Sequence, residues 1–302
     1  LSARVTLQFL HEAGHLQPIL QKPGDYFRQR LSPDGKRLAL TVTDSSGSDI
    51  WVYDLSRDTM TRLSYNANGQ GPVWTPDGRF IVFLDKGGMF GTRADGAGRP
   101  QQLAQSTNTQ YPGSFSADGK HLTFMETGSG GYDLFTLTME NDGTNLHAGK
   151  PEPFLRTSFD ERHAMLSPDG RWIAYTSNES GSYQVYVRAF PDKGGKWQIS
   201  NAGGVYPVWS PNGRELFFRT EDNRIMAVSY TATGDSFTRD RPRGWSQTTI
   251  ANIGMLSNYD LAPDGKRVAA VMPAETADSQ NPASRVIYLQ NFFDEVRRRA
   301  AR

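Results

Sequence analysis

The side chains that could carry out chemistry do not form a catalytic pattern in this sequence of 302 residues. Cysteine is absent, which excludes thiolate nucleophiles, disulfides, Cys-ligated zinc and iron–sulfur clusters. His11 and His15 are four residues apart, but they flank Gly14, whose turn should keep them off a common helix face, so we assign no zinc-hydrolase motif. The remaining histidines are scattered, at positions 121, 147 and 163. We therefore predict neither a metal nor a cofactor.

The sequence also lacks the residue spacings of serine-nucleophile and carboxylate catalysis. The sequence contains no Gly-x-Ser-x-Gly nucleophile elbow, and its nearest Gly/Ser cluster, residues 128–131, is typical of a hairpin turn. The acidic pairs Asp160-Glu161 and Glu221-Asp222 fall in expected loops. Neither a P-loop nor a Gly-x-Gly-x-x-Gly fingerprint is present. We predict that this chain has no catalytic residues.

An internal repeat must position whatever site exists. A small residue, Pro or Ala, Asp or Asn, and Gly recur before alternating apolar positions, as in Ser32-Pro33-Asp34-Gly35. Pro presets the first turn position, Asp suits the second, and Gly takes the left-handed conformation. The glycines are spaced by 41 to 52 residues and are Gly35, Gly78, Gly119, Gly170, Gly213 and Gly265. Four strands per unit is the signature of a propeller blade, so we predict an all-β, six-bladed β-propeller of four-stranded antiparallel blades as one domain over 1–302.

The sequence also predicts the structure of the two ends of the chain and of the insertions in the two longest repeats. Residues 1–22 contain two expected strands, Val5–Leu10 and Leu16–Leu20, which we predict close the ring on the last blade and cover its edge. That blade's own strands are expected at 258–261, 267–272 and 285–289. Residues 291–302 predict a short terminal helix, either solvated or a docking tail. The insertions at 141–150 and 231–247 are expected to be outer-edge loops.

The aligned repeats place two adjacent positions, six and seven residues before the motif Asp or Asn, at the mouth of the central channel, where propellers usually bind ligands. The residues there form a polar and aromatic ring, which suits a small anion, a sugar or a peptide terminus; a water-filled mouth without a ligand is the alternative. Its candidate binding residues are Arg28, Gln70, Tyr111, Arg162, His163, Tyr206 and Asn258. Two residues later in the repeat, Arg30 and Asp260 fall in the first and last blades, so we predict a pair that holds the ring shut. Trp74, Phe115 and Trp209 are expected to pack between blades.

The Ser-Pro-Asp-Gly-Lys/Arg repeats resemble the TolB-type, or PD40 (WD40-like), propeller repeat. The chain is also similar to the C-terminal propeller of bacterial, acidobacterial-type receptor serine/threonine kinases. Residues 7–14, LQFLHEAG, resemble that family's opening hairpin, with Phe9 in place of Trp and His11 in place of Asp. Residues 49–55, DIWVYDL, and 291–296, NFFDEV, resemble its later motifs. The resemblance implies an extracytoplasmic sensor module; the kinase's own catalytic motifs are missing from this chain.

We therefore expect a non-catalytic sensor or interaction propeller that binds a small molecule, glycan or peptide at the channel mouth, or a protein on its loop face. A propeller lyase or hydrolase with an axial His/Arg site, a TolB-like periplasmic scaffold and the gate of a serine peptidase remain alternatives. The formal net charge of +1 argues against nucleic acid as a partner. No apolar run is long enough to span a membrane. Because the first residue is Leu1, we expect tethering through a missing N-terminal membrane helix.

Overall fold

The computed structural model describes residues 4–192 and 194–274, and all of the regular secondary structure within them is β-strand. The predicted all-β class is confirmed. Every pairing between the strands of these residues is antiparallel. The expected strand at 285–289 and the expected helix at 291–302 lie outside the described residues.

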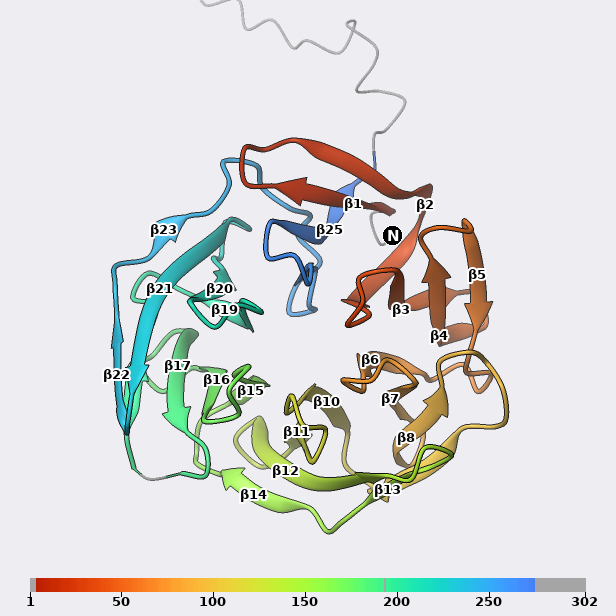
Figure 1. The fold of residues 1–302 in the computed structure, drawn as a ribbon, viewed down its shortest axis with the longest axis horizontal. Helices are drawn as coiled ribbons and strands as arrows, with labels where there is room; N and C mark the ends of the chain where they lie inside the picture. Colours follow the sequence, from red (N-terminus) through yellow and green to blue (C-terminus); the bar gives the residue numbers. More distant parts are fainter. Residues whose placement is uncertain (1–3, 193, 275–302) are drawn as a thin grey trace, which may run out of the picture.

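The strands form five sheets arranged around a common axis, with β6, β10, β15 and β19 nearest the centre (Figure 1). One four-stranded sheet contains β6 (Gln70–Trp74), β7 (Phe80–Asp85), β8 (Gly88–Arg93) and β9 (Gln101–Gln105). The other contains β15 (Glu161–Leu166), β16 (Trp172–Ser177), β17 (Gln184–Ala189) and β18 (Lys196–Gln198). The first five-stranded sheet contains β10 (Gln110–Phe115), β11 (His121–Thr127), β12 (Tyr132–Asn141), β13 (Leu146–Ala148) and β14 (Glu152–Leu155). The second contains β19 (Val205–Trp209), β20 (Glu215–Arg219), β21 (Ile225–Thr233), β22 (Ser236–Arg239) and β23 (Arg243–Gly244).

The fifth sheet has seven strands and joins the two ends of the described chain. Its order is β24 (Tyr259–Leu261), β25 (Arg267–Pro273), β1 (Val5–His11), β2 (Leu16–Leu31), β3 (Arg37–Asp44), β4 (Gly47–Asp54) and β5 (Thr59–Arg62). Strand β1 pairs with β25 from Val5↔Pro273 to His11↔Arg267, and with β2 on its other side. Strand β2 is one strand of 16 residues, not two: its first part pairs with β1 and its last part with β3.

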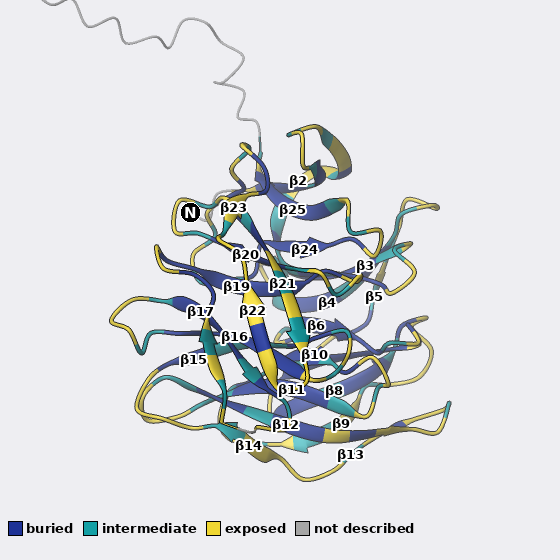
Figure 2. Cartoon of the chain, turned by 60° about the vertical axis from the view of Figure 1, so that its left-hand side comes forward, coloured by how far each residue is buried: buried dark blue, intermediate teal, exposed yellow. Residues whose placement is uncertain are grey.

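Apolar clusters between successive sheets form the core, which is why the middle strands are buried on both faces (Figure 2). Strand β16 is buried at all six residues. The indole N–H of Trp74 donates to the Arg30 carbonyl at 2.9 Å, and that of Trp209 to the Met165 carbonyl at 2.8 Å, so both rings link neighbouring sheets as the motif predicted. Phe115 packs partly buried against the cluster between its sheet and the preceding one.

The repeat turns have the geometry that their residues predict. All six glycines of the repeat lie at φ of 65 to 73°, the left-handed region that only glycine adopts cheaply. The Gly35 amide donates to the Ser32 carbonyl at 2.8 Å, and the Ser32 hydroxyl donates to Asp34 Oδ1 at 2.6 Å. The turns join the first and second strands of each repeat, from β2–β3 to β24–β25.

The two insertions were expected as loops, and that expectation is wrong. Residues 141–150 extend β12 into a hairpin with β13, and residues 231–247 extend β21 into a hairpin with β22 and a short strand, β23. Each hairpin buries apolar side chains that a loop would expose: Leu146 lies in the core beside Met139, and Phe237 stacks on Tyr230 with ring centroids 5.1 Å apart. Burial of these side chains stabilises the extra strands.

Candidate functional site

A recurring bulge in the inner strands directs side chains towards the axis. In five of the repeats, the pairing between the first and second strands shifts register. The shift lies at the position six residues before the Asp or Asn of the repeat motif. Arg28, His163 and Tyr206 occupy this position with φ of 54, 56 and 58°, and Gly71 with φ of 65°. A left-handed non-glycine residue costs about 1–2 kcal/mol. Such strain persists where a bulge re-aims a side chain, which marks the axis as a candidate site.

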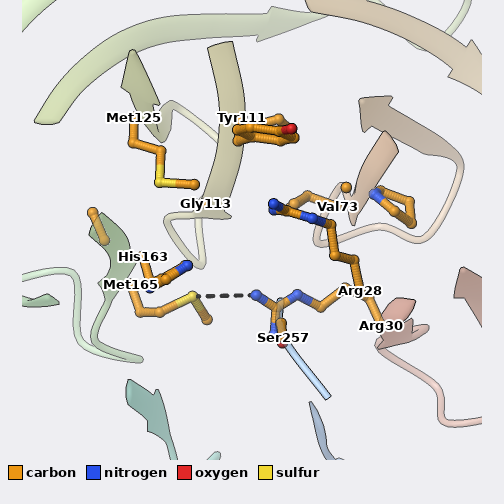
Figure 3. Close-up of a pocket in the computed structure, with 13 residues that line it drawn as sticks. Arg28, Arg30, Val73, Tyr111, Gly113, Met125, His163, Met165 and Ser257 are labelled. Atoms are coloured by element: carbon orange, nitrogen blue, oxygen red, sulfur yellow. Dashed lines mark hydrogen bonds between the residues drawn. The ribbon is translucent and has the colours of Figure 1, made fainter. Parts of the chain in front are cut away.

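Three of these bulge residues, Arg28, Gly71 and His163, line a small axial cavity of about 30 Å³ (Figure 3). That volume admits one or two water molecules. Within the described residues, Arg28, Arg30 and His163 point towards one another across it from β2 and β15 (Figure 3). The rest of the lining is mostly apolar or small and includes Gly71, Tyr111, Gly113, Met125, Met165 and Ser257. The axial cavity is therefore a narrow space with cationic donors on an apolar wall.

Arg28 is held by an aromatic face instead of by a carboxylate. Its guanidinium carbon lies 4.0 Å from the centre of the Tyr111 ring, and Arg28 Nε is buried without a hydrogen-bond partner among the described residues. Burial lowers the pKa of Arg28. The Tyr111 hydroxyl donates to Gln70 Oε1 at 3.3 Å, which fixes the ring that supports the cation. Three of the predicted mouth residues are thus brought together.

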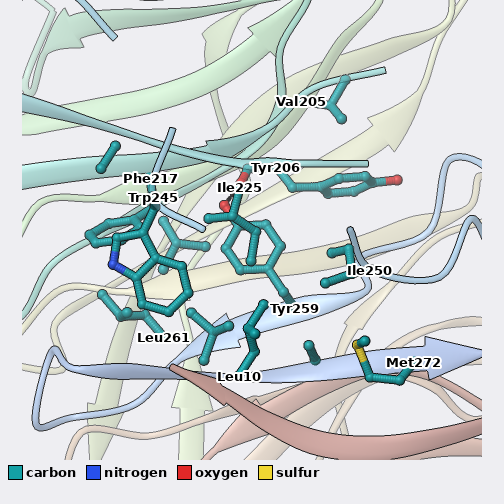
Figure 4. Packing of buried hydrophobic residues seen from close by; sticks show 14 residues of the cluster. Leu10, Val205, Tyr206, Phe217, Ile225, Trp245, Ile250, Tyr259, Leu261 and Met272 are labelled. Atoms are coloured by element: carbon teal, nitrogen blue, oxygen red, sulfur yellow. Dashed lines mark hydrogen bonds between the residues drawn. The ribbon is translucent and has the colours of Figure 1, made fainter. Parts of the chain in front are cut away.

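His163 and Tyr206 form the second part of the site. Their ring centroids are 4.0 Å apart, and both ring nitrogens of His163 are buried without partners in the described chain. Burial, followed by the charges of Arg28 and Arg162, holds the pKa of His163 well below 6.5, so the ring is neutral at pH 7. Tyr206 is 3% exposed, and burial raises its pKa to about 12. Its hydroxyl also has no hydrogen-bond partner among the described residues, and it points away from the apolar cluster around Tyr259 and Trp245 (Figure 4).

Four predicted mouth residues, Gln70, Arg162, Tyr206 and Asn258, are not part of the cavity lining. Arg162 turns to Asp160, with Nε 2.7 Å from Oδ2, and its guanidinium lies 4.7 Å from the Tyr132 ring centre. Asn258 was expected at the mouth, but it is fully buried and its amide donates to the Ala251 carbonyl at 2.7 Å. The preceding residue, Ser257, lines the cavity instead. The short β24 begins only at Tyr259, which explains the change of position.

Arg30 and Asp260, paired by the repeat alignment, are in contact. Arg30 Nη1 donates to Asp260 Oδ1 at 3.1 Å, and the Leu31 amide donates to Asp260 Oδ2 at 2.8 Å. Burial raises the pKa of Asp260, although Arg30 and the Leu31 amide oppose that shift. Ser114 occupies the same repeat position, and its hydroxyl accepts from the Leu166 amide at 2.7 Å. The contact between the last and first repeats therefore has the same form as one between consecutive repeats.

Arg219 is a site residue that the sequence reasoning missed. It is only 5% exposed, it donates to Asn223 Oδ1 at 3.2 Å and to the Gly254 carbonyl at 3.1 Å, and its guanidinium lies 5.0 Å from the Tyr206 ring centre. The sequence does contain a sign of it, because Arg219 is the only charged residue at its position in the six aligned repeats. The column, seven residues after the motif Asp or Asn, reads Thr41, Leu84, Met125, Thr176, Arg219 and Val271.

The segment His11–His15, His-Glu-Ala-Gly-His, has the spacing of a helical zinc-peptidase motif. In the structure it is the turn between β1 and β2, where the His11 amide donates to the His15 carbonyl at 2.9 Å. Glu12 pairs with Arg243 at 2.9 Å. No cluster of three or more potential metal ligands occurs among residues 4–192 and 194–274. The same part of the chain has no helix that could cross a membrane.

A buried acidic group lies beside the mouth, outside the axial cavity. Glu161 is 1% exposed, its Oε1 accepts from the Thr157 hydroxyl at 2.5 Å, and its Oε2 has no partner among the described residues. Burial raises the pKa of Glu161 to about 7, and the charges of Asp133, Glu179 and Asp160 add to that shift. The carboxyl is therefore half-protonated near neutral pH.

This shift gives a prediction for stability. The folded state keeps the Glu161 proton up to about pH 7 whereas an ordinary glutamate loses it near pH 4.5, so folding stability should fall as the pH rises through this interval. Glu161→Gln should remove the loss, and the variant should exceed the wild type by about 2 kcal/mol at pH 8 but not at pH 5. Urea unfolding at both pH values measures the difference. Parallel pH profiles for the two proteins would contradict the assignment.

Comparison with known proteins supports the fold. Residues 2–150 match the family model PD40, described as TolB beta propeller domain. The Tol-Pal system protein TolB of Francisella tularensis is 27% identical over 205 residues, which are 60% of this chain and 43% of that protein. The chain thus matches less than half the length of this curated relative. The predicted resemblance to TolB-type propellers is confirmed.

Solved structures give the same fold at lower identity. The putative TolB from Agrobacterium tumefaciens has a TM-score of 0.65 at 18% identity, covering 91% of this chain and all of that one. A putative 6-phosphogluconolactonase from Bacteroides uniformis has a TM-score of 0.56 at 18% identity, covering 89% of each chain. At these identities the likeness concerns the fold alone, since one propeller architecture carries both binding proteins and enzymes.

Proposed function

We propose, from the premise that this chain is a TolB-like β-propeller, that it is a non-catalytic interaction module whose partner binds at the mouth of the axis. The observation that carries this proposal is the set of strained bulge residues, Arg28, His163 and Tyr206, which present polar atoms without partners in the described chain. Strain is retained where function requires it. The name Tol-Pal system protein, which the relatives carry, favours a protein partner over a small molecule.

We also propose that the sheets are six blades closed into one ring, with β1 as the strand of the last blade that joins it to the first. Three contacts support closure, because they link the last repeat to the first. The Arg28 amide donates to the Ser257 carbonyl at 2.9 Å, Gln29 donates to the Ala269 carbonyl at 3.0 Å, and Asp260 contacts Arg30 and Leu31. A continuous apolar cluster also packs β1 and β25 against β2 and β3.

The sensor part of an extracytoplasmic receptor kinase, tethered through an upstream membrane helix, is the cellular setting we propose for this module. The opening and 49–55 motifs support it; the closing motif at 291–296 lies outside the described residues. A TolB-like scaffold in the bacterial envelope is the second setting. Reading the gene upstream of Leu1 separates them: a kinase domain and a membrane helix support the first, and their absence contradicts it.

An enzymatic role is favoured by one observation, the neutral His163 beside Arg28 in the axial cavity. Against it, no carboxylate orients the His163 ring, whose two nitrogens have no partner in the described chain. The cavity of about 30 Å³ also has space for only a small head group of a substrate between these groups. A screen of hydrolase and lyase substrates decides: turnover that His163→Ala abolishes would replace the proposal with a catalytic one.

Partner binding at the mouth gives the direct test. We expect the immobilised protein to retain a defined set of envelope proteins, and Tyr111→Ala to reduce that retention at least tenfold, because loss of one central aromatic anchor typically costs about 2 kcal/mol or more. Lys36→Ala and Lys266→Ala on the opposite, turn face are matched controls that should retain the same set. Equal retention by all variants, or none by the wild type, would contradict the proposal.

A further inference from the structure

The axis carries more positive charge than its neighbours neutralise. Four arginines lie close enough to the His163 ring to lower its pKa, namely Arg28, Arg162, Arg30 and Arg219. Among the described residues, two of the four have a carboxylate partner: Arg30 contacts Asp260 and Arg162 contacts Asp160. Arg28 and Arg219 have none there. Arginines removed from water are normally paired, so this surplus of two charges favours an anion.

At the axial cavity, Arg28 and Arg30 keep guanidinium donors that have no strong hydrogen-bond acceptor. Arg28 Nε has no hydrogen-bond partner among the described residues, and its guanidinium lies over the Tyr111 ring instead. The second arm of Arg30 reaches only the Met165 thioether, with Nη2 3.8 Å from Sδ, and a thioether is a weak acceptor (Figure 3). The Tyr206 hydroxyl is buried without a partner in the described chain, and Arg28 and Arg219 both act on its pKa. The guanidinium groups of Arg28 and Arg30, which both line the cavity, are thus available to one acceptor.

We propose that the axial cavity binds a single carboxylate group between Arg28 and Arg30. The planar fork of Arg28 matches a carboxylate in two parallel hydrogen bonds. A volume of about 30 Å³ takes the head group only, so the remainder of the ligand lies towards the mouth. The inference rests on the proposed binding function and names the chemistry of its ligand. The carboxylate belongs either to a free organic acid or to a protein chain that reaches the axis.

Calorimetric titration in chloride-free buffer at constant low ionic strength tests this site, with sodium acetate as the probe and acetamide as its neutral counterpart of equal size. We expect acetate to bind and acetamide not to bind. Arg28→Gln should weaken acetate binding at least tenfold, because it removes the charge and the paired hydrogen bonds of the guanidinium. Arg28→Lys, which keeps the charge but loses the fork, should fall between the two.

Arg267→Gln is the matched control, because Arg267 also stacks on an aromatic ring, Phe9, at 4.0 Å, but outside the axial cavity. It should bind acetate within twofold of the wild type. Equal binding of acetate and acetamide, or equal acetate affinity for Arg28→Gln and Arg267→Gln when both melt as folded proteins, would overturn the proposal. A triglycine peptide with a free carboxyl terminus, compared with its amide, identifies the source: binding of the acid form supports a protein carboxylate, and binding of acetate alone supports a free acid.

The two proposals fail separately. Acetate binding without any retained envelope protein would leave the carboxylate site in place and remove the proposed interaction with a protein. Retention that Tyr111→Ala abolishes, without acetate binding, would leave the interaction in place and overturn the carboxylate site.

Discussion

Replacing Asp260 with alanine is expected to lower the free energy of unfolding by about 3–5 kcal/mol. Asp260 is 8% exposed and accepts hydrogen bonds from two neighbours, the Arg30 guanidinium and the Leu31 amide. Its loss leaves a partly buried cation among other arginines and an amide without an acceptor. Removing one partner of a buried pair costs more than the pair itself contributes, because the remaining charge is uncompensated.

Urea unfolding measures this effect, as a lower midpoint at unchanged slope. Asp264→Ala is the control, because Asp264 lies in the same repeat but on the surface, where it pairs with Arg267 at 3.1 Å and accepts from the Lys266 amide at 2.9 Å. Since an exposed ion pair contributes about 0–1 kcal/mol and an ordinary hydrogen bond about 1 kcal/mol, this variant should lose about 1–2 kcal/mol. Asp260→Asn should lie between them, since an amide oxygen can still accept from Leu31. The double variant Arg30→Met/Asp260→Leu should recover most of the loss. Equal effects of Asp260→Ala and Asp264→Ala would refute a specific role for this contact.

Replacing Gln8 with proline in β1 should also be strongly destabilising, by at least about 3 kcal/mol. Gln8 sits in the middle of the seven-stranded sheet, opposite Ala270 on β25 and Pro18 on β2. Proline cannot donate to a strand ladder and is tolerated mainly at edges, so it should break the strand that connects the two ends of the chain. The expected result follows from the proposed closure of the ring through β1.

Gln8→Ala isolates the backbone effect, because the half-buried side chain bonds only to Thr6 Oγ1, at 3.2 Å, among the described residues. That variant should unfold within about 0.5–1 kcal/mol of the wild type. Limited proteolysis should cut the proline variant, and not the alanine variant, near β25, whose pairing with β1 would be lost. If both variants unfold alike, β1 does not hold the ends of the chain together.

The turns and the strand pattern could be predicted because they depend on neighbouring residues. Ser32, Pro33, Asp34 and Gly35 set a tight turn by their own conformational preferences, and five further copies do the same. The insertions could not be predicted as hairpins. Leu146 and Phe237 stay in strands because apolar surface from a neighbouring strand or sheet covers them, and no adjacent residue reports that surface.

The axial site, too, could be predicted from the sequence only in part. The repeat alignment by itself predicted Arg28, Tyr111 and His163 at the axial cavity and matched Arg30 with Asp260. Only the tertiary structure decided that Asn258 is buried away from the mouth, that Arg162 is neutralised by Asp160, and that the buried Arg219 joins the site. The physical reason is that a repeat fixes the direction of a side chain, whereas its charge balance and the space before it depend on side chains from other sheets.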